Sequence, residues 1–270
     1  MRAALLVALA ACGDSAPDLI TVIDEPRVLA ILSEPSVLDV DGEIALTPFV
    51  VDGNGPRRGD PIQLRACSPW IFVAEPASDC AGTNALPLTL TDGRFKVTTA
   101  QLLEAFPPPG GTTLDAASLA VAIEAGLEPR IPVIAEVEAD GQTLIARRDL
   151  RIVVEANELS NPGLLSVRFD GNLDPTLRAG RDHAVVLEFV GSSFDPRGPD
   201  DPRLERFDCY FYSPHGELAE HELDVRDPEI TTETPPNRYT AGAPGDSWLF
   251  VVVTDRTGGM SADAIPLTIE

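Results

Sequence analysis

The run Trp248-Leu249-Phe250-Val251-Val252-Val253-Thr254-Asp255 is apolar at consecutive positions and rich in the β-branched and aromatic residues that favour strands. Since neighbouring side chains of a strand point to opposite faces, this run predicts a central strand that is buried on both sides. From Arg27 onward, most other apolar residues alternate with polar ones in short runs separated by Gly, Pro, Asp and Asn. That pattern is typical of half-buried strands in a β-sandwich.

Two tight hairpins are expected in the first half of the chain. A strand with leucines alternating at 86–90 leads into Asp92-Gly93, and Asp140-Gly141 separates the alternating runs at 133–137 and 144–146. Asp-Gly suits the positive φ values of a two-residue turn.

A short helical insertion is expected between these hairpins. Thr98 and Gln101 have the spacing of a capping box, so residues 100–106 favour a helix. The segment 114–126 has two interpretations, because Asp115 suits a helix N-cap while alternation within the segment also suits a strand. The helix is slightly favoured.

Residues 155–163 have the composition of a domain junction, and strands restart after them. The expected strand faces of the second half are Leu165, Val167 and Phe169; Val185, Leu187 and Phe189; Phe207, Cys209 and Phe211; and Ala219, His221, Leu223 and Val225.

A weak internal repeat links the two halves. An opening strand at 28–32, then Pro35 and a Gly-preceded strand at 44–46, is echoed by 164–169, Pro175 and 185–187. The repeat distance is about that of one sandwich domain.

The final run from Trp248 to Gly259, followed by Ile265, Leu267 and Ile269, resembles the last two strands of PKD-like and bacterial immunoglobulin-like domains. Glu34-Pro35 to Leu46 resembles the first strands of the same group. The resemblance implies an all-β chain with two tandem immunoglobulin-like β-sandwich domains, at 26–156 and 161–270, and a short helical insertion in the first. It implies little about function.

The charge balance bears on partners. The 270 residues include 43 acidic and 20 basic ones, for a net charge of -23. Because binding to nucleic acid depends on Lys and Arg displacing counterions from phosphates, no nucleic-acid partner is expected.

The N-terminus predicts export. Residues 1–11 have the features of a signal peptide, with Arg2 before an apolar run. Leu9-Ala10-Ala11-Cys12 resembles the lipobox of bacterial lipoproteins, which implies that Cys12 is lipidated and attaches the chain to the membrane, with 12–25 as a tether. Gly13 resembles the pattern of lipoproteins sent to the outer membrane. No later segment reaches 18 apolar residues, so the attachment is expected through lipid alone.

The remaining cysteines suggest structural roles. Cys67 and Cys80 are 13 positions apart, and in an exported protein they are expected to form a disulfide rather than a zinc site. Cys209 alternates with phenylalanines, which favours a buried, unreactive thiol over a nucleophile.

No catalytic residue can be assigned from the sequence. His215 and His221 lie among glutamates, but a structural or solvated role is favoured over a metal site. No Gly-x-Ser-x-Gly motif marks a nucleophilic serine for which His183 could act as the base, so a catalytic triad is not expected.

Calcium is the one cofactor for which the loops offer ligands, because it prefers several oxygen ligands and the loops are rich in acidic residues. The residues are Asp39, Asp41, Asp52, Asn54, Glu155, Asn157, Glu158, Asp195, Asp200 and Asp201. A calcium-loop signature is lacking, so the prediction is no cofactor and no metal.

The sequence therefore predicts an envelope lipoprotein that binds a protein or glycan partner without catalysis. Two alternatives are an enzyme or enzyme accessory that uses carboxylates not paired in sequence, and a structural spacer of the envelope.

Overall fold

The computed structural model describes residues 22–68, 80, 84–107, 114–155, 159–173, 175–190, 196–198, 201–204, 206–225, 233–255 and 257–270. Within these ranges most residues are in strands and two short helices occur. The predicted signal peptide and Cys12 lie outside the described residues.

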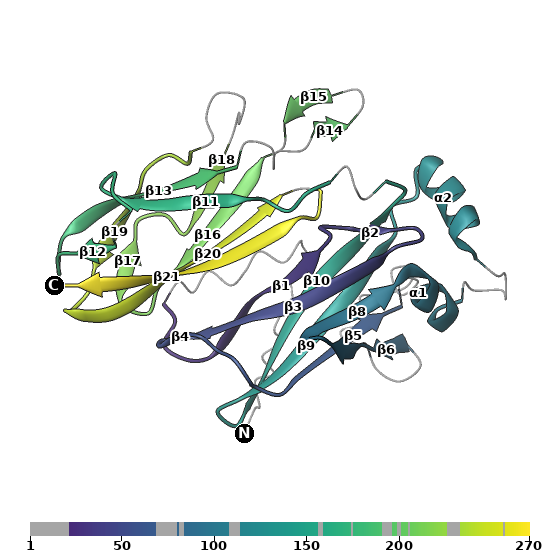
Figure 1. The fold of residues 1–270 in the computed structure, drawn as a ribbon, viewed down its shortest axis with the longest axis horizontal. Helices are drawn as coiled ribbons and strands as arrows, with labels where there is room; N and C mark the ends of the chain where they lie inside the picture. The colour runs from purple at the N-terminus through teal and green to yellow at the C-terminus, as the bar shows by residue number, and fades with distance from the viewer. Residues whose placement is uncertain are drawn as a thin grey trace, which may run out of the picture.

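The first half of the chain forms two facing sheets (Figure 1). One contains, in spatial order, β1 (Arg27–Glu34), β3 (Glu43–Asp52), β8 (Arg94–Thr98) and β7 (Thr89–Thr91), with β4 (Gly55–Pro56) paired to β3. The other contains β2 (Leu38–Asp39), β10 (Gln142–Val153), β9 (Arg130–Ala139), β5 (Ile62–Cys67) and β6 (Ala85–Pro87). We call this pair the first sandwich.

The second half repeats this arrangement as the second sandwich. One sheet contains β11 (Leu164–Phe169), β13 (Asp182–Phe189), β19 (Asn237–Ala241) and β17 (Gly216–Leu218). The other contains β12 (Thr176–Leu177), β21 (Met260–Ile269), β20 (Gly245–Asp255), β16 (Phe207–Tyr212) and β18 (Glu222–Val225). A separate hairpin is formed by β14 (Pro196–Gly198) and β15 (Asp201–Leu204).

Both sandwiches divide their opening strand between two sheets. β1 and β11 pair antiparallel with β3 and β13, whereas the short β2 and β12 run parallel to the last strands, β10 and β21. A register shift occurs early in each opening strand, at Val28/Ala30 and at Leu164/Ser166. The shared topology is immunoglobulin-like and confirms the predicted all-β fold class. The limits 26–156 and 161–270 stay a prediction about separate folding units.

The two Asp-Gly hairpins are confirmed. Asp92 and Asp140 both have φ of 51°, and the glycines that follow have φ of 78° and 79°. Sequence reasoning missed a third such turn at Asp170, also at φ 51°.

The expected strand faces at 86–90 and at Leu165 were wrong. Leu86, Leu88 and Leu90 do not share one strand, because the chain passes from β6 in one sheet to β7 in the other; Leu90 is 59% exposed. Leu165 does not share a face with Val167, because the register shift beside it turns its side chain outward, and it is 61% exposed.

The insertion is helical, as favoured. α1 (Thr99–Ala105) begins with the complete capping box of Thr98 and Gln101. α2 (Ala116–Glu124) begins where the Asp115 carboxylate accepts the Ser118 N–H. Both helices lie in the connection from β8 to β9, at one end of the first sandwich (Figure 1).

Each sandwich has its own apolar core. The first core includes Leu46, Val133 and Leu150, and the second includes Leu187, Phe211 and Val251. A third cluster contains buried residues of both halves, and we call it the junction cluster: Ile23, Ala30, Val51, Tyr212, Phe250 and Val252, with Leu29, Leu32, Phe49, Tyr210, Trp248, Met260, Ala262 and Ala264 packed against it.

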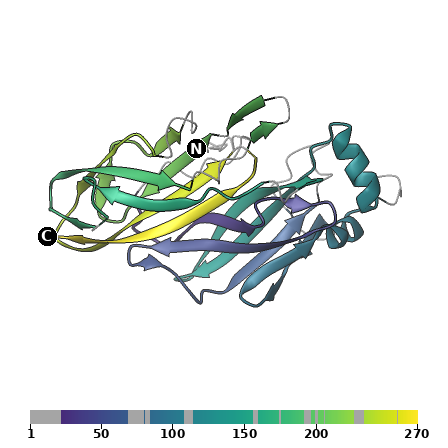
Figure 2. The same ribbon diagram turned by 45° about the horizontal axis from the view of Figure 1, so that its top comes forward.

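The junction cluster shows that the sandwiches lie side by side. Both views place β21 next to β1 (Figures 1 and 2). The outer face of the β21-β20-β16 sheet therefore packs on β1, β3 and β4 of the first sandwich. This explains the central-strand pattern of Trp248–Val253: one face enters the core of the second sandwich, and the other is covered by the first.

Candidate functional site

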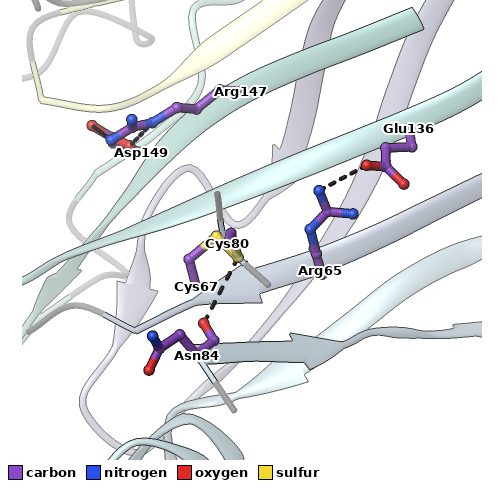
Figure 3. Close-up of a disulfide and its surroundings, with 7 residues drawn as sticks. All are labelled: Arg65, Cys67, Cys80, Asn84, Glu136, Arg147 and Asp149. Atoms are coloured by element: carbon purple, nitrogen blue, oxygen red, sulfur yellow. Dashed lines mark hydrogen bonds and ion pairs between the residues drawn. A yellow bond between two sulfur atoms is a disulfide. The ribbon is translucent and has the colours of Figure 1, made fainter. Parts of the chain in front are cut away.

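The predicted disulfide is present. Cys67 ends β5, and its Cα lies 5.4 Å from that of Cys80, to which it is bonded. The bridge packs against Ile134, near the ion pair of Arg65 with Glu136, whose N–O distance is 2.7 Å (Figure 3). The bridge thus ties the β5–β6 connection to the outer face of its sheet.

Cys209 is a free thiol at 0% exposure in the second core. Burial raises the pKa of this thiol well above its usual range, and nearby Asp208 and Asp224 act in the same direction. The reactive thiolate is therefore disfavoured at this position.

His183 has structural partners. Its Nδ1 lies 2.7 Å from Oδ2 of Asp170, and the Arg178 N–H donates to its Nε2 at 3.1 Å. The Ala184 N–H and the His183 ring together hold the pKa of Asp170 below its ordinary value. The imidazole thus joins the Asp170 turn to the start of β13.

The structure does not bring His215 and His221 into a metal site. No cluster of three or more His, Cys, Asp or Glu side chains that could hold a metal occurs among the residues that the structure describes. The expected strand face through Ala219 and His221 was wrong, since β18 begins only at Glu222 and pairs with β16. The chain has just left β17, which belongs to the other sheet.

Of the acidic loops, Asp52 belongs to an ion-pair group. The Arg57 guanidinium binds Asp52, Asp60 and Asp140 at 2.9, 2.8 and 3.1 Å. The hydrogen bonds from Arg57 hold the pKa of Asp60 below its ordinary value. The side chains of Asn157, Glu158, Asp195, Asp200 and Asp201 lie outside what the structure describes.

Burial raises the pKa of Asp255, the last residue of β20 before the turn to β21. Its Oδ1 accepts the N–H groups of Thr257, Gly258 and Gly259 at 2.9, 2.7 and 2.6 Å. The raised pKa of Asp255 comes from its burial at this turn, and Asp255 is not among the residues that line the two cavities at the first sandwich.

An open hollow of about 300 Å³ lies at the flank of the first sandwich, where the chain crosses from β6 to β7. Its lining residues are Glu43, Leu86, Pro87, Leu88, Thr89, Thr91, Lys96, Val97, Thr98 and Gln101. We call it the flank hollow. A second cavity of about 20 Å³ lies between the helices and the first core and is lined by apolar side chains.

The chemistry of the flank hollow suits a neutral polar ligand. Lys96 and Glu43 form an ion pair at 2.9 Å, so their charges offset each other. Threonine hydroxyls at 89 and 91 both donate and accept, and the half-buried Leu86 supplies apolar surface. Sequence reasoning did not select these residues, although Lys96 is the only lysine of the chain.

Sequence reasoning also missed Arg148, which is 6% exposed and donates to backbone carbonyls of both sandwiches. A signal was available. Alternate residues of a strand face the same side, and Arg148 alternates with Ala146, Leu150 and Ile152, which point inward.

Fold and site together define the class: an all-β, immunoglobulin-like double sandwich with an open polar hollow. No protein-family model matches the chain, and no curated protein does. No helix in the described part of the chain is long and apolar enough to cross a membrane.

Solved structures with some similarity include three bacterial proteins. The Yersinia pseudotuberculosis adhesin InvE is 9% identical over 88% of this chain and 58% of its own, with a TM-score of 0.25. A Bacteroides thetaiotaomicron lipoprotein is 9% identical over 39% of this chain and 79% of its own, with a TM-score of 0.27. The fibronectin(III)-like modules of Clostridium thermocellum CbhA are 11% identical over 89% of this chain and 93% of their own, with a TM-score of 0.26. The fold class rests on the strand order described above, and these low scores carry no argument about function.

Proposed function

We propose that this protein is a lipid-anchored binding or scaffolding module of the cell envelope that performs no catalysis. The anchor is Cys12, in the lipobox-like sequence after an apolar run, and an outer-membrane location accords with Gly13. The observation that carries the binding role is the flank hollow: its volume of about 300 Å³ is at the lower end of the range of ligand sites.

The shape of the molecule favours binding over a spacer role. A spacer gains length when domains are joined end to end, whereas these sandwiches pack side by side through the junction cluster. The polar flank hollow stays open, while the apolar face of β20 and β21 is covered.

The electrostatics favour binding over catalysis. A general acid needs a raised carboxyl pKa in a cleft that admits substrate. Among the described residues, burial raises a carboxyl pKa at Asp255, whose oxygen accepts backbone N–H groups of its own turn. In the flank hollow, the carboxylate of Glu43 is already paired with Lys96.

A sedimentation assay tests this function. Purified Cys12→Ser protein, which cannot be lipidated, is mixed with isolated envelopes of the producing cells. We expect saturable binding that drops at least about tenfold in Thr89→Arg, whose side chain fills the hollow, and is unchanged in Thr143→Arg. Thr143 is an exposed residue on the other sheet of the same sandwich.

Equal binding by both variants, or no binding by the parent protein, would overturn the role of the hollow. Release of soluble fragments from the envelopes by catalytic amounts of protein would support the enzyme alternative. Detergent partition of the full chain against Cys12→Ala tests the anchor separately.

A further inference from the structure

One guanidinium at the junction binds backbone from both sandwiches. Arg148 projects from β10, and its Nη1 donates to the Ile31 carbonyl at 2.5 Å. Its Nη2 donates to the Ser36 carbonyl at 3.3 Å and to the Gly258 carbonyl at 2.6 Å. Ile31 and Ser36 belong to the first sandwich, whereas Gly258 belongs to the β20–β21 turn of the second.

The turn that receives Arg148 is held in shape by its own residues. Asp255 accepts three consecutive N–H groups of the turn, and Gly258 has φ of 114°, which side chains rarely adopt. At Gly259 an added Cβ would lie 2.0 Å from Asp255 Oδ2. The turn therefore holds the Gly258 carbonyl in one orientation. The negative charge of Asp255 also attracts the positive charge of Arg148, and burial of the guanidinium reduces the screening of this attraction by water.

Two further polar side chains form hydrogen bonds at the same end, where the connecting segment meets the sandwiches. The Asn161 amide donates to the Ser33 carbonyl at 2.7 Å, and its Oδ1 accepts the Met260 N–H at 2.9 Å. The Ser36 hydroxyl donates to the Leu159 carbonyl at 3.1 Å. These directional bonds lie where the chain crosses between the sandwiches, at 155–163.

Farther from the crossing, aromatic and aliphatic side chains dominate the contact. Phe49 meets Phe250 edge to face, with ring centroids 6.4 Å apart, and Trp248 stacks on Phe250 at 6.3 Å. Apolar packing of this kind is strong but weakly directional, because it depends mainly on the area removed from water. Hydrogen bonds require a defined geometry.

We infer that Arg148 is a positioning residue that fixes the angle between the two sandwiches, while apolar packing in the junction cluster holds them together. With Arg148 in place, the flank hollow and the free faces of the second sandwich keep one relative orientation. The inference concerns conformation and stands apart from whether the hollow binds a ligand.

Distance measurements between paired spin labels test the inference. Labels at Thr143→Cys and Thr268→Cys in a Cys12→Ser background lie on exposed residues of the two sandwiches, at the ends remote from the crossing. A change of angle about the crossing moves these ends the most. Cys209 is buried and does not compete for label.

We expect one narrow distance distribution in the parent and in the control Arg147→Met, since Arg147 is exposed and pairs with Asp149 of its own strand. Arg148→Met should broaden or shift the distribution, and Arg148→Lys should partly restore it. A folded Arg148→Met protein with the parent's distribution would overturn the inference. If Arg148→Met does not fold, Arg148→Lys takes its place, because a lysine cannot reach all three carbonyls at once: a broadened or shifted distribution supports the inference, and the parent's distribution overturns it.

Discussion

The substitution Phe250→Ala distinguishes two arrangements: sandwiches packed side by side, and sandwiches that do not contact each other. Phe250 is 0% exposed on the outer face of β20, where it contacts Phe49 and Trp248. If the pair stays packed, truncation leaves a cavity in the junction and lowers the free energy of unfolding by about 3–5 kcal/mol. If the second sandwich stood alone, Phe250 would face water and the same change would cost within about 0.5 kcal/mol.

The assay is urea unfolding followed by circular dichroism, with linear extrapolation to water. The matched control is Phe211→Ala, since Phe211 is also 0% exposed but lies in the second core. Its loss of about 3–5 kcal/mol is expected in either case. A full loss for Phe211→Ala together with less than about 1 kcal/mol for Phe250→Ala would refute the packing described here.

Four further predictions concern single features. Replacing both Cys67 and Cys80 by serine should lower the free energy of unfolding by about 3 kcal/mol in urea titrations, because a 13-residue separation is no longer closed. A reducing agent should lower the stability of the parent by a similar amount and leave the variant unchanged; a parent that is insensitive to the reducing agent would contradict the bridge. Asp115→Ala removes a helix N-cap and should cost about 1 kcal/mol, whereas Asp115→Asn should cost less. Gly55→Ala places a Cβ 2.6 Å from an indole at φ 119°, so calorimetry should show a lower melting temperature; an unchanged one contradicts the junction geometry. Asp170 has a lowered pKa in the folded state, so its contribution is present above the unfolded pKa of about 3.8 and is lost as pH falls through the folded pKa; Asp170→Asn should destabilise at pH 7 and destabilise less as the pH is lowered below about 3.8, and a pH-independent effect would contradict this.

Local chemistry made much of the fold predictable. The Asp-Gly turns at 92 and 140 and the caps at Thr98 and Asp115 each depend on neighbours within four residues. The disulfide of Cys67 was predictable from the expected export and from the cysteine spacing.

Features that depend on distant residues were not predictable in the same way. Leu165 was expected in the core, but the register shift beside it is decided by pairing with β13. The apolar run at 248–253 indicated a central strand, and nothing in it indicates that the outer face is covered by β1.

The candidate site was mostly hidden in the sequence. The flank hollow depends on the crossing from β6 to β7, which the regular leucines at 86, 88 and 90 obscured. Arg147 and Arg148 are neighbours on one strand and therefore face opposite sides, so the inward direction of Arg148 could be predicted from the alternation. Its partner Gly258 could not, because it is 110 positions away.

Small-angle X-ray scattering of Cys12→Ser protein tests the side-by-side arrangement most directly. A compact body of this length has a radius of gyration of about 18 Å. Two sandwiches joined end to end, with strands near 33 Å long, would give roughly 22–24 Å. We predict a value close to the compact one, and a value in the end-to-end range would contradict the account.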